Sequence, residues 1–231
     1  MSLSKAPYKG TRDFFPADMR QRDFIFQKMR ETAELFSYEA YDGPLLEEVD
    51  LYLAKSGEEL INEQIYSFID RGERKVAIRP EMTPTVARMV AQIHREAAKP
   101  LRCYAIPNLM RYEKPQKGRL REHWQFNCDL FGAPEGLGEI EILQVATGLL
   151  RSFGANEEHF EVLLNDRRVV DAVFGRLLQL SKEQAHKLYK VIDKAKKVTP
   201  EALDKMVAEI IPHEVARAHF KDYLALNTFP G

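Results

Sequence analysis

The feature that most constrains the fold of this chain is a pair of strand-like segments joined by a short basic loop. Residues 101–110 and 123–131 are rich in apolar and aromatic side chains, whereas residues 114–121 carry four cations in eight positions. Parallel strands need a crossover connection that usually contains a helix. Strand, basic loop, strand is therefore predicted to be an antiparallel pair rather than a βαβ unit.

Further elements of both kinds surround this pair. The periodicities predict helices over 17–36, from Thr83 to about 93 and over 139–153, a hairpin made of 65–70 and 76–79, and short strands over 38–46 and 160–164. Pro44 has no amide proton for a ladder, so its strand should lie at an edge or an interface. Thr83 is expected to cap its helix, with Pro84 in the first turn.

The last third of the chain has a different character. From Arg167 to about Leu226 the patterns are helical only and rich in Lys, Glu and Ala, with one interruption at Thr199-Pro200. The order is thus an α+β region followed by an all-helical region, with a boundary expected near residues 165–182.

Composition excludes several classes of protein. The net charge is −1, so any nucleic-acid contact must come from a local patch. No apolar run reaches the roughly 18 residues of a membrane helix, and the first residues lack the apolar stretch of a secretory signal. Two cysteines make no disulfide framework, so we expect reduced thiols and a cytoplasmic location. The six histidines are scattered, so we expect no protein metal site. Neither GxxxxGK[ST] nor GxGxxG occurs, so the common phosphate-binding loops are missing.

Polar side chains gather on one face of the predicted pair. Arg111 and Glu113 lie two apart at the end of the first strand, and Gln125, Asn127 and Asp129 alternate on the second. The opposite face would hold apolar residues, namely Tyr104, Ile106, Trp124, Phe126 and Leu130. The polar face is either open to water or the floor of a ligand site.

Two neighbouring segments also carry polar side chains that could bind a ligand. The loop 114–121 is either a solvated hairpin tip or a clamp for polyphosphate and RNA, because guanidinium groups bind phosphate oxygens bidentately. Segment 79–83 offers a carboxylate, Glu81, and a hydroxyl, Thr83, which suit an ammonium group.

These segments resemble a known family. Residues 110–126 (MRYEKPQKGRLREHWQF) are similar to motif 2 of class II aminoacyl-tRNA synthetases, and Pro-Gln-Lys-Gly-Arg within them is typical of the histidyl type. Residues 9–16 resemble the N-terminal signature of that family, and 79–90 its histidine-binding segment. The helix ending near Phe36 and the strand with Pro44 resemble motif 1. The resemblance covers residues 5 to about 165, and 189–194 is a weaker match to a helical insertion.

The resemblance implies a role for each matching residue. Arg111 would be the catalytic residue, holding the ATP α-phosphate and the histidine carboxylate. The expected ligand sets are Arg111, Glu113, Arg119 and Arg121 for ATP; Glu81, Thr83, Arg111, Gln125 and Asp129 for histidine; and Gln116 and Lys117 for tRNA. ATP and Mg²⁺ would be the cofactors, tRNA(His) the second substrate, and a homodimer would form through motif 1.

The same resemblance sets the expected domains. Residues 1–165 would be the N-terminal part of a class II catalytic domain, an antiparallel sheet flanked by helices, and 166–231 a helical insertion segment. Motif 3, a second catalytic arginine and the anticodon-binding domain would lie after residue 231. We therefore expect the chain to hold part of an active site and to be weak or inactive alone.

Three functions are compatible with these residues. The first is a histidine–tRNA ligase. The second is the synthetase-like regulatory subunit of ATP phosphoribosyltransferase, which need not keep the ATP- and tRNA-facing residues of motif 2. The third is an unrelated α+β domain with a basic hairpin. The presence of Arg111, Glu113, Gln116 and the 117–119 loop favours the ligase.

Overall fold

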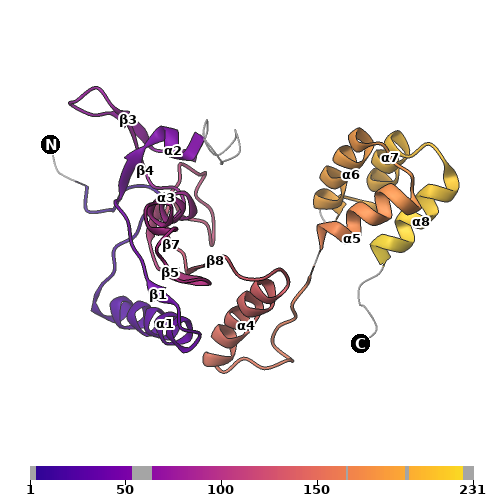
Figure 1. The fold of residues 1–231 in the computed structure, drawn as a ribbon. Helices are drawn as coiled ribbons and strands as arrows, with labels where there is room; N and C mark the ends of the chain where they lie inside the picture. The colour runs from indigo at the N-terminus through magenta and orange to yellow at the C-terminus, as the bar shows by residue number, and fades with distance from the viewer. Residues whose placement is uncertain (1–3, 54–63, 165, 196–197, 226–231) are drawn as a thin grey trace. The chain divides into compact units, whose positions relative to one another are not determined.

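The computed structural model describes residues 4–53, 64–164, 166–195 and 198–225. The chain divides into two separately packed units, residues 1–160 and 161–231 (Figure 1). The first unit contains every strand found in the described residues, and the second is helical.

The predicted antiparallel pair is present, but each strand is interrupted. Its inner part pairs β5 (Leu101–Ala105) with β8 (Asn127–Phe131), and its outer part pairs β6 (Asn108–Met110) with β7 (Glu122–Trp124). The break on the first strand falls at Ile106-Pro107, where proline lacks a ladder donor. A short strand, β1 (Glu39–Ala40), runs parallel to β5 and gives the order β1–β5–β8, a parallel pairing that the sequence did not predict.

A second antiparallel sheet has the order β2–β4–β3. The predicted hairpin is confirmed as β3 (Ser67–Ile69) and β4 (Lys75–Ile78), and β2 (Leu46–Glu48) pairs with the other side of β4. The predicted strand 38–46 is therefore two strands, β1 and β2, each at the edge of its sheet. Pro44 lies in the link between them.

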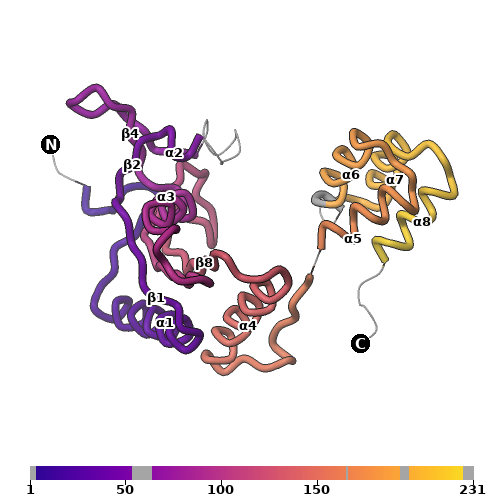
Figure 2. The backbone as a smooth tube through the Cα atoms, viewed as in Figure 1, coloured from indigo at the N-terminus to yellow at the C-terminus, as the bar shows by residue number. Residues whose placement is uncertain are grey.

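Helices cover both faces of the β1–β5–β8 sheet. On one face lie α1 (Pro16–Leu35) and α4 (Leu137–Ser152), which pack side by side (Figure 2). Their Ala33 and Val145 share a cluster with Tyr104, and Ile106 and Phe126 pack against it, as predicted for the apolar face. On the other face, Met82 and the helix α3 (Thr83–Ile93) pack against Cys103. The short α2 (Val49–Leu53) packs near β4.

Two local predictions are wrong. Thr83 does not cap α3: the N-cap residue is Met82, and Thr83 is the first residue of the helix. Residues 160–164 form no strand, and Leu163 and Leu164 are exposed. An apolar, β-branched sequence indicates a strand only where a neighbouring strand can pair with it.

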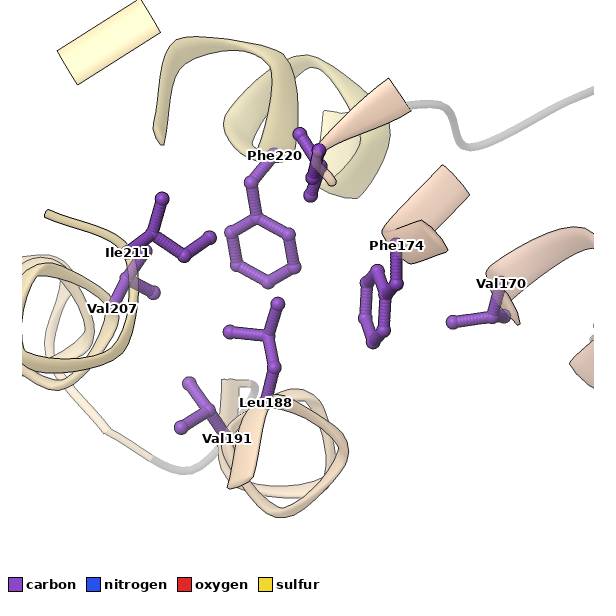
Figure 3. Packing of buried hydrophobic residues seen from close by; sticks show 8 residues of the cluster. Val170, Phe174, Leu188, Val191, Val207, Ile211 and Phe220 are labelled. Atoms are coloured by element: carbon purple, nitrogen blue, oxygen red, sulfur yellow. The ribbon is translucent and has the colours of Figure 1, made fainter. Parts of the chain in front are cut away.

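The second unit is built from helices, as predicted. They are α5 (Arg167–Ala172), the π-helical turn η2 (Val173–Leu177), α6 (Lys182–Ala195), α7 (Pro200–Ile210) and α8 (Glu214–Ala225). Phe174, Leu188 and Phe220 point toward one another in its core (Figure 3). Thr199 caps α7 by accepting a hydrogen bond from the Ala202 amide at 3.3 Å. Among the described helices, none is long and apolar enough to cross a membrane.

Candidate functional site

Arg111 joins the basic loop to the segment that precedes α3. It follows β6 directly, and its amide donates a hydrogen bond to the carbonyl of Arg121 at 2.8 Å. Its Nε donates to the carbonyl of Pro80, also at 2.8 Å. A single guanidinium is thus held against the backbone next to Glu81, where the two segments meet.

Glu113 and Arg119 form a bidentate ion pair across the loop. Arg119 Nη2 donates to Glu113 Oε1 at 2.7 Å, and Arg119 Nε donates to Oε2. The Glu113 side chain is 9% exposed and that of Arg119 is 55% exposed. The hydrogen bond from Arg119, followed by the charges of Arg119 and Arg111, lowers the pKa of Glu113. The carboxylate is therefore ionised near neutral pH and lies within the field of both arginines.

His123 belongs to the same cluster, although the sequence reasoning missed it. It pairs with Leu109 across β6 and β7. Burial, with the charge of Arg111, lowers the pKa of His123, while Glu113 opposes the shift. The imidazole is thus neutral near pH 7. The alternation of Gln125, Asn127 and Asp129, continued two residues back along the strand, would have identified it.

The tip of the loop is open and exposed. Gln116 and Arg119 exchange backbone hydrogen bonds of 3.1 and 2.9 Å, which leaves Lys117 and Gly118 as the turn. Gly118 has φ +79°, a conformation that glycine adopts without strain. The side chains of Gln116 and Lys117 are exposed at this tip, so a large partner can reach them.

Arg121 differs from the other cations of the loop because it is buried, with 8% exposure. Its Nε donates to the carbonyl of Glu113 at 3.0 Å, and its Nη1 donates to the Tyr8 hydroxyl at 2.9 Å. Its guanidinium also lies 4.2 Å from the centre of the Tyr112 ring. These contacts favour a structural role for a residue that was expected to contact ATP.

The segment with Glu81 and Thr83 is held in place by Arg79. This arginine is buried; its Nε donates to the Asn108 carbonyl at 2.9 Å. Its Nη1 donates to Asp42 Oδ1 at 2.7 Å and to the Gly43 carbonyl at 2.9 Å. Arg79 thereby ties the end of β4 to β6, while Glu81 is half-buried and Thr83 is exposed at the start of α3.

Asp129 and Asn127 lie on the face of the β1–β5–β8 sheet that α3 covers. Asp129 is directly opposite Cys103, which packs against α3, and opposed residues share a face. Asp129 Oδ2 and Asn127 Oδ1 are buried and have no hydrogen-bond partner within the described residues. Burial raises the pKa of Asp129. Buried acceptors of this kind are costly unless a ligand or water satisfies them.

The predicted site residues are thus only partly brought together. Arg111, Glu113 and Arg119 form one cluster beside segment 80–83, whereas Asp129 lies on the β1–β5–β8 sheet, called the inner sheet below. Gln125 is exposed in the link between β7 and β8, where it lines a cavity of about 720 Å³ with His123 and with residues of α1. Within the described residues, no three His, Cys, Asp or Glu side chains are grouped to hold a metal ion. The cluster can bind an anion with several oxygens next to a small polar ligand.

Comparison with protein families gives a match over nearly the whole chain. The model of the family "Histidyl-tRNA synthetase" matches residues 10–229. Among curated proteins, the histidine–tRNA ligase of Leptospira biflexa is 46% identical over 235 residues, covering 99% of this chain and 54% of that protein. The chain spans about half the length of the curated relatives it matches.

Solved structures give the same fold. The histidyl-tRNA synthetase from Nostoc sp. PCC 7120 has a TM-score of 0.81 at 17% identity, over 100% of this chain and 50% of that one. An ATP phosphoribosyltransferase regulatory subunit/histidyl-tRNA synthetase from Bacillus halodurans has a TM-score of 0.71 at 19% identity, over 94% of this chain and 62% of that one. At these identities the likeness establishes the fold, which is of the class II synthetase type.

Proposed function

The chain belongs to the histidyl-tRNA synthetase family, and from this premise we propose that the protein activates histidine with ATP and transfers it to tRNA(His). The observation that carries the proposal is the position of Arg111. Its guanidinium is bound to the Pro80 carbonyl, so a phosphate-binding cation lies beside the segment with Glu81 and Thr83. Amino-acid activation needs ATP and the amino acid to lie next to each other.

In this reaction the histidine carboxylate attacks the α-phosphorus of ATP, and the bond to the leaving pyrophosphate breaks. Arg111 would bind the carboxylate and the α-phosphate and offset the negative charge that develops between them. Glu113 and Arg119 would hold ATP from the loop. Mg²⁺, when bound, would neutralise phosphate oxygens, which would be its main ligands because the described residues offer no acidic cage.

Histidine would lie between α3 and the inner sheet. Glu81 and Thr83 would take its α-ammonium group at the start of α3. Asp129, with its unsatisfied Oδ2, would accept a hydrogen bond from an imidazole N–H, and Gln125 would contact the substrate from the link between β7 and β8.

The remaining partners follow from exposed surfaces. Gln116 and Lys117 at the loop tip would meet the acceptor end of tRNA(His). The homodimer would use α1 and the link around Pro44, since Phe24, Ile25 and Leu35 leave apolar surface exposed on α1.

We place the protein in the cytoplasm. We further propose that residues 1–165 are the N-terminal part of the catalytic domain and 166–231 the helical insertion. The curated relatives are named as ligases, which favours the ligase over the regulatory subunit.

The test of the function is histidine-dependent exchange of pyrophosphate into ATP by the full-length protein. Arg111→Ala should lose a bidentate, charge-assisted contact and weaken ATP binding by about 1.5–3 kcal/mol, measured by calorimetry. Arg151→Ala, which removes an exposed arginine paired with Glu157, is the matched control and should bind ATP like the parent. Equal ATP affinity in Arg111→Ala and the parent would rule out this role.

Substrate selection is tested at Asp129. Asp129→Ala in the full-length protein should lower kcat/KM for histidine activation by roughly a hundredfold, on the order of 3 kcal/mol, because the imidazole N–H loses its acceptor. The ATP affinity of the same variant should barely change. A pyrophosphate exchange rate within about threefold of the parent would contradict the imidazole role.

A further inference from the structure

Residues 8–11 form a tight turn that lies against the base of the loop 114–121. The Tyr8 carbonyl accepts hydrogen bonds from the Thr11 amide at 2.9 Å and from the Thr11 hydroxyl at 2.7 Å. Gly10 has φ +88° in this turn. The turn therefore has one defined shape, which requires glycine at its third position.

The turn is bonded directly to Arg121, the last residue of the loop 114–121. The Gly10 carbonyl accepts from the Arg121 amide at 2.8 Å. A Cβ atom at Gly10 would lie 2.7 Å from Arg121 Cγ, closer than real Cβ contacts allow, and 3.0 Å from Pro115 Cγ, which is tighter than most. Glycine is thus needed at this position for its close approach to both sides of the loop as well as for its backbone conformation.

Arg121 connects this turn to the backbone of Glu113. Its Nη1 donates to the Tyr8 hydroxyl and its Nε to the Glu113 carbonyl. Its guanidinium lies 5.5 Å from the centre of the Tyr8 ring and 4.2 Å from that of the Tyr112 ring. With these bonds and both rings against it, the charge of Arg121 is directed inward rather than toward a ligand.

We propose that the Tyr8–Thr11 turn and Arg121 form a clasp that positions Glu113 and Arg119 for ATP. Arg121 fixes the main chain of Glu113, and the Glu113 side chain in turn fixes Arg119 through their ion pair. Arg121 is then a positioning residue that acts through Glu113. This inference rests on the proposed function, because it assigns the clasp to the ATP side of that site.

The experiment compares Arg121→Lys and Tyr8→Phe with the parent in the full-length protein, by pyrophosphate exchange. Lysine keeps the charge but loses the Nε donor, and phenylalanine keeps the ring but loses the hydroxyl. We expect KM for ATP to rise roughly fivefold in Arg121→Lys and roughly twofold in Tyr8→Phe, with KM for histidine within about twofold of the parent.

Arg102→Lys is the matched control. Arg102 makes a bidentate pair with Glu141 on the α4 side of the inner sheet, at 2.7 and 2.8 Å. Its loss should lower Tm without changing KM for ATP. If Arg102→Lys raised KM for ATP as much as Arg121→Lys, or if Arg121→Lys raised both KM values equally, Arg121 would serve stability only. If Arg121→Lys abolished ATP binding while Tyr8→Phe matched the parent, Arg121 would be a ligand of ATP and the clasp would be wrong.

A second measurement tests the clasp independently of the proposed function. Hydrogen exchange of the Gln116 and Arg119 amides without ligand should be faster in Tyr8→Phe than in the parent, whether or not the parent is active. An inactive parent with faster exchange in Tyr8→Phe would overturn the proposed function and keep the clasp. An active parent with unchanged exchange and unchanged KM for ATP in both variants would overturn the clasp.

Discussion

In the helical unit, the buried apolar side chains of the described residues make one cluster shared by α5, η2, α6, α7 and α8, whereas in the sheet-bearing unit most of them are divided among three smaller clusters. Arginines join the parts of the sheet-bearing unit: Arg79 ties β4 to β6 and to Asp42, and Arg102 ties β5 to α4. Apolar burial is non-directional, but hydrogen-bonded guanidinium groups fix both distance and angle. Polar contacts also join the helices of the second unit, such as that from Gln184 Nε2 to the Ile210 carbonyl, but only in the sheet-bearing unit do they hold the charged side chains of the candidate site.

The largest loss of stability is expected at Phe220, in the core of the helical unit. Phe220→Ala should cost about 3–5 kcal/mol of unfolding free energy, because Phe220 is fully buried against Phe174 and Leu188 and its loss leaves a cavity. The measurement is urea denaturation followed by far-UV circular dichroism and by the fluorescence of Trp124, the single tryptophan, which lies in the first unit. The helical transition should move and the Trp124 transition should not. Equal shifts of both signals would mean that the two units unfold as one.

A smaller effect is expected for the arginine that ties β4 to β6. Arg79→Met should cost about 2–3 kcal/mol, because the partly buried carbonyls of Gly43 and Asn108 lose their donor while the Asp42 carboxylate stays in water. Here Trp124 fluorescence should report the earlier transition. Arg74→Met, which removes an exposed ion pair with Asp70, is the control and should change stability by less than about 0.5 kcal/mol. Similar losses in the two variants would show that burial of the arginine does not matter.

The smallest expected effect has the opposite sign. Because burial raises the pKa of Asp129, the folded protein binds its proton more readily than the unfolded chain does. The carboxylate therefore lowers stability as the pH rises above the unfolded pKa, and the penalty is absent below it. Asp129→Asn should gain roughly 1 kcal/mol at pH 7, and the gain should vanish near pH 3. Urea denaturation at the two pH values measures it, and a gain that is equal at both would exclude titration of Asp129 as the cause.

The sequence predicted elements whose signals are local. The antiparallel pairing, the β3–β4 hairpin and the helices α1, α3 and α4 follow from periodicity and turn residues. The strand predicted at 160–164 failed because its apolar pattern says nothing about a partner. The pairing of β1 with β5 is also long-range, since it joins Glu39 to Cys103.

The site residues also divide into those with local contacts, which the sequence predicts, and those with distant partners, which it does not. Arg111, Glu113 and Arg119 are neighbours in one hairpin, so their cluster could be predicted from the sequence. Arg79 could not be, because its partners Asp42 and Asn108 lie 37 and 29 residues away. Arg121 looked like its neighbouring cations, and only burial against residues of the distant N-terminal turn distinguishes it.

The interruption of the long hairpin at Pro107 and Gln125 has a consequence for how this protein can change over evolution. The Gln125 amide still reaches the Pro107 carbonyl, at 3.3 Å, but no regular ladder joins the β6–β7 pair to the β5–β8 pair. In an unbroken ladder, an insertion near the loop would shift the register and turn every later side chain to the wrong face. Here the irregular link can absorb such a shift. The register of the β6–β7 pair can therefore change while Asp129 stays opposite Cys103.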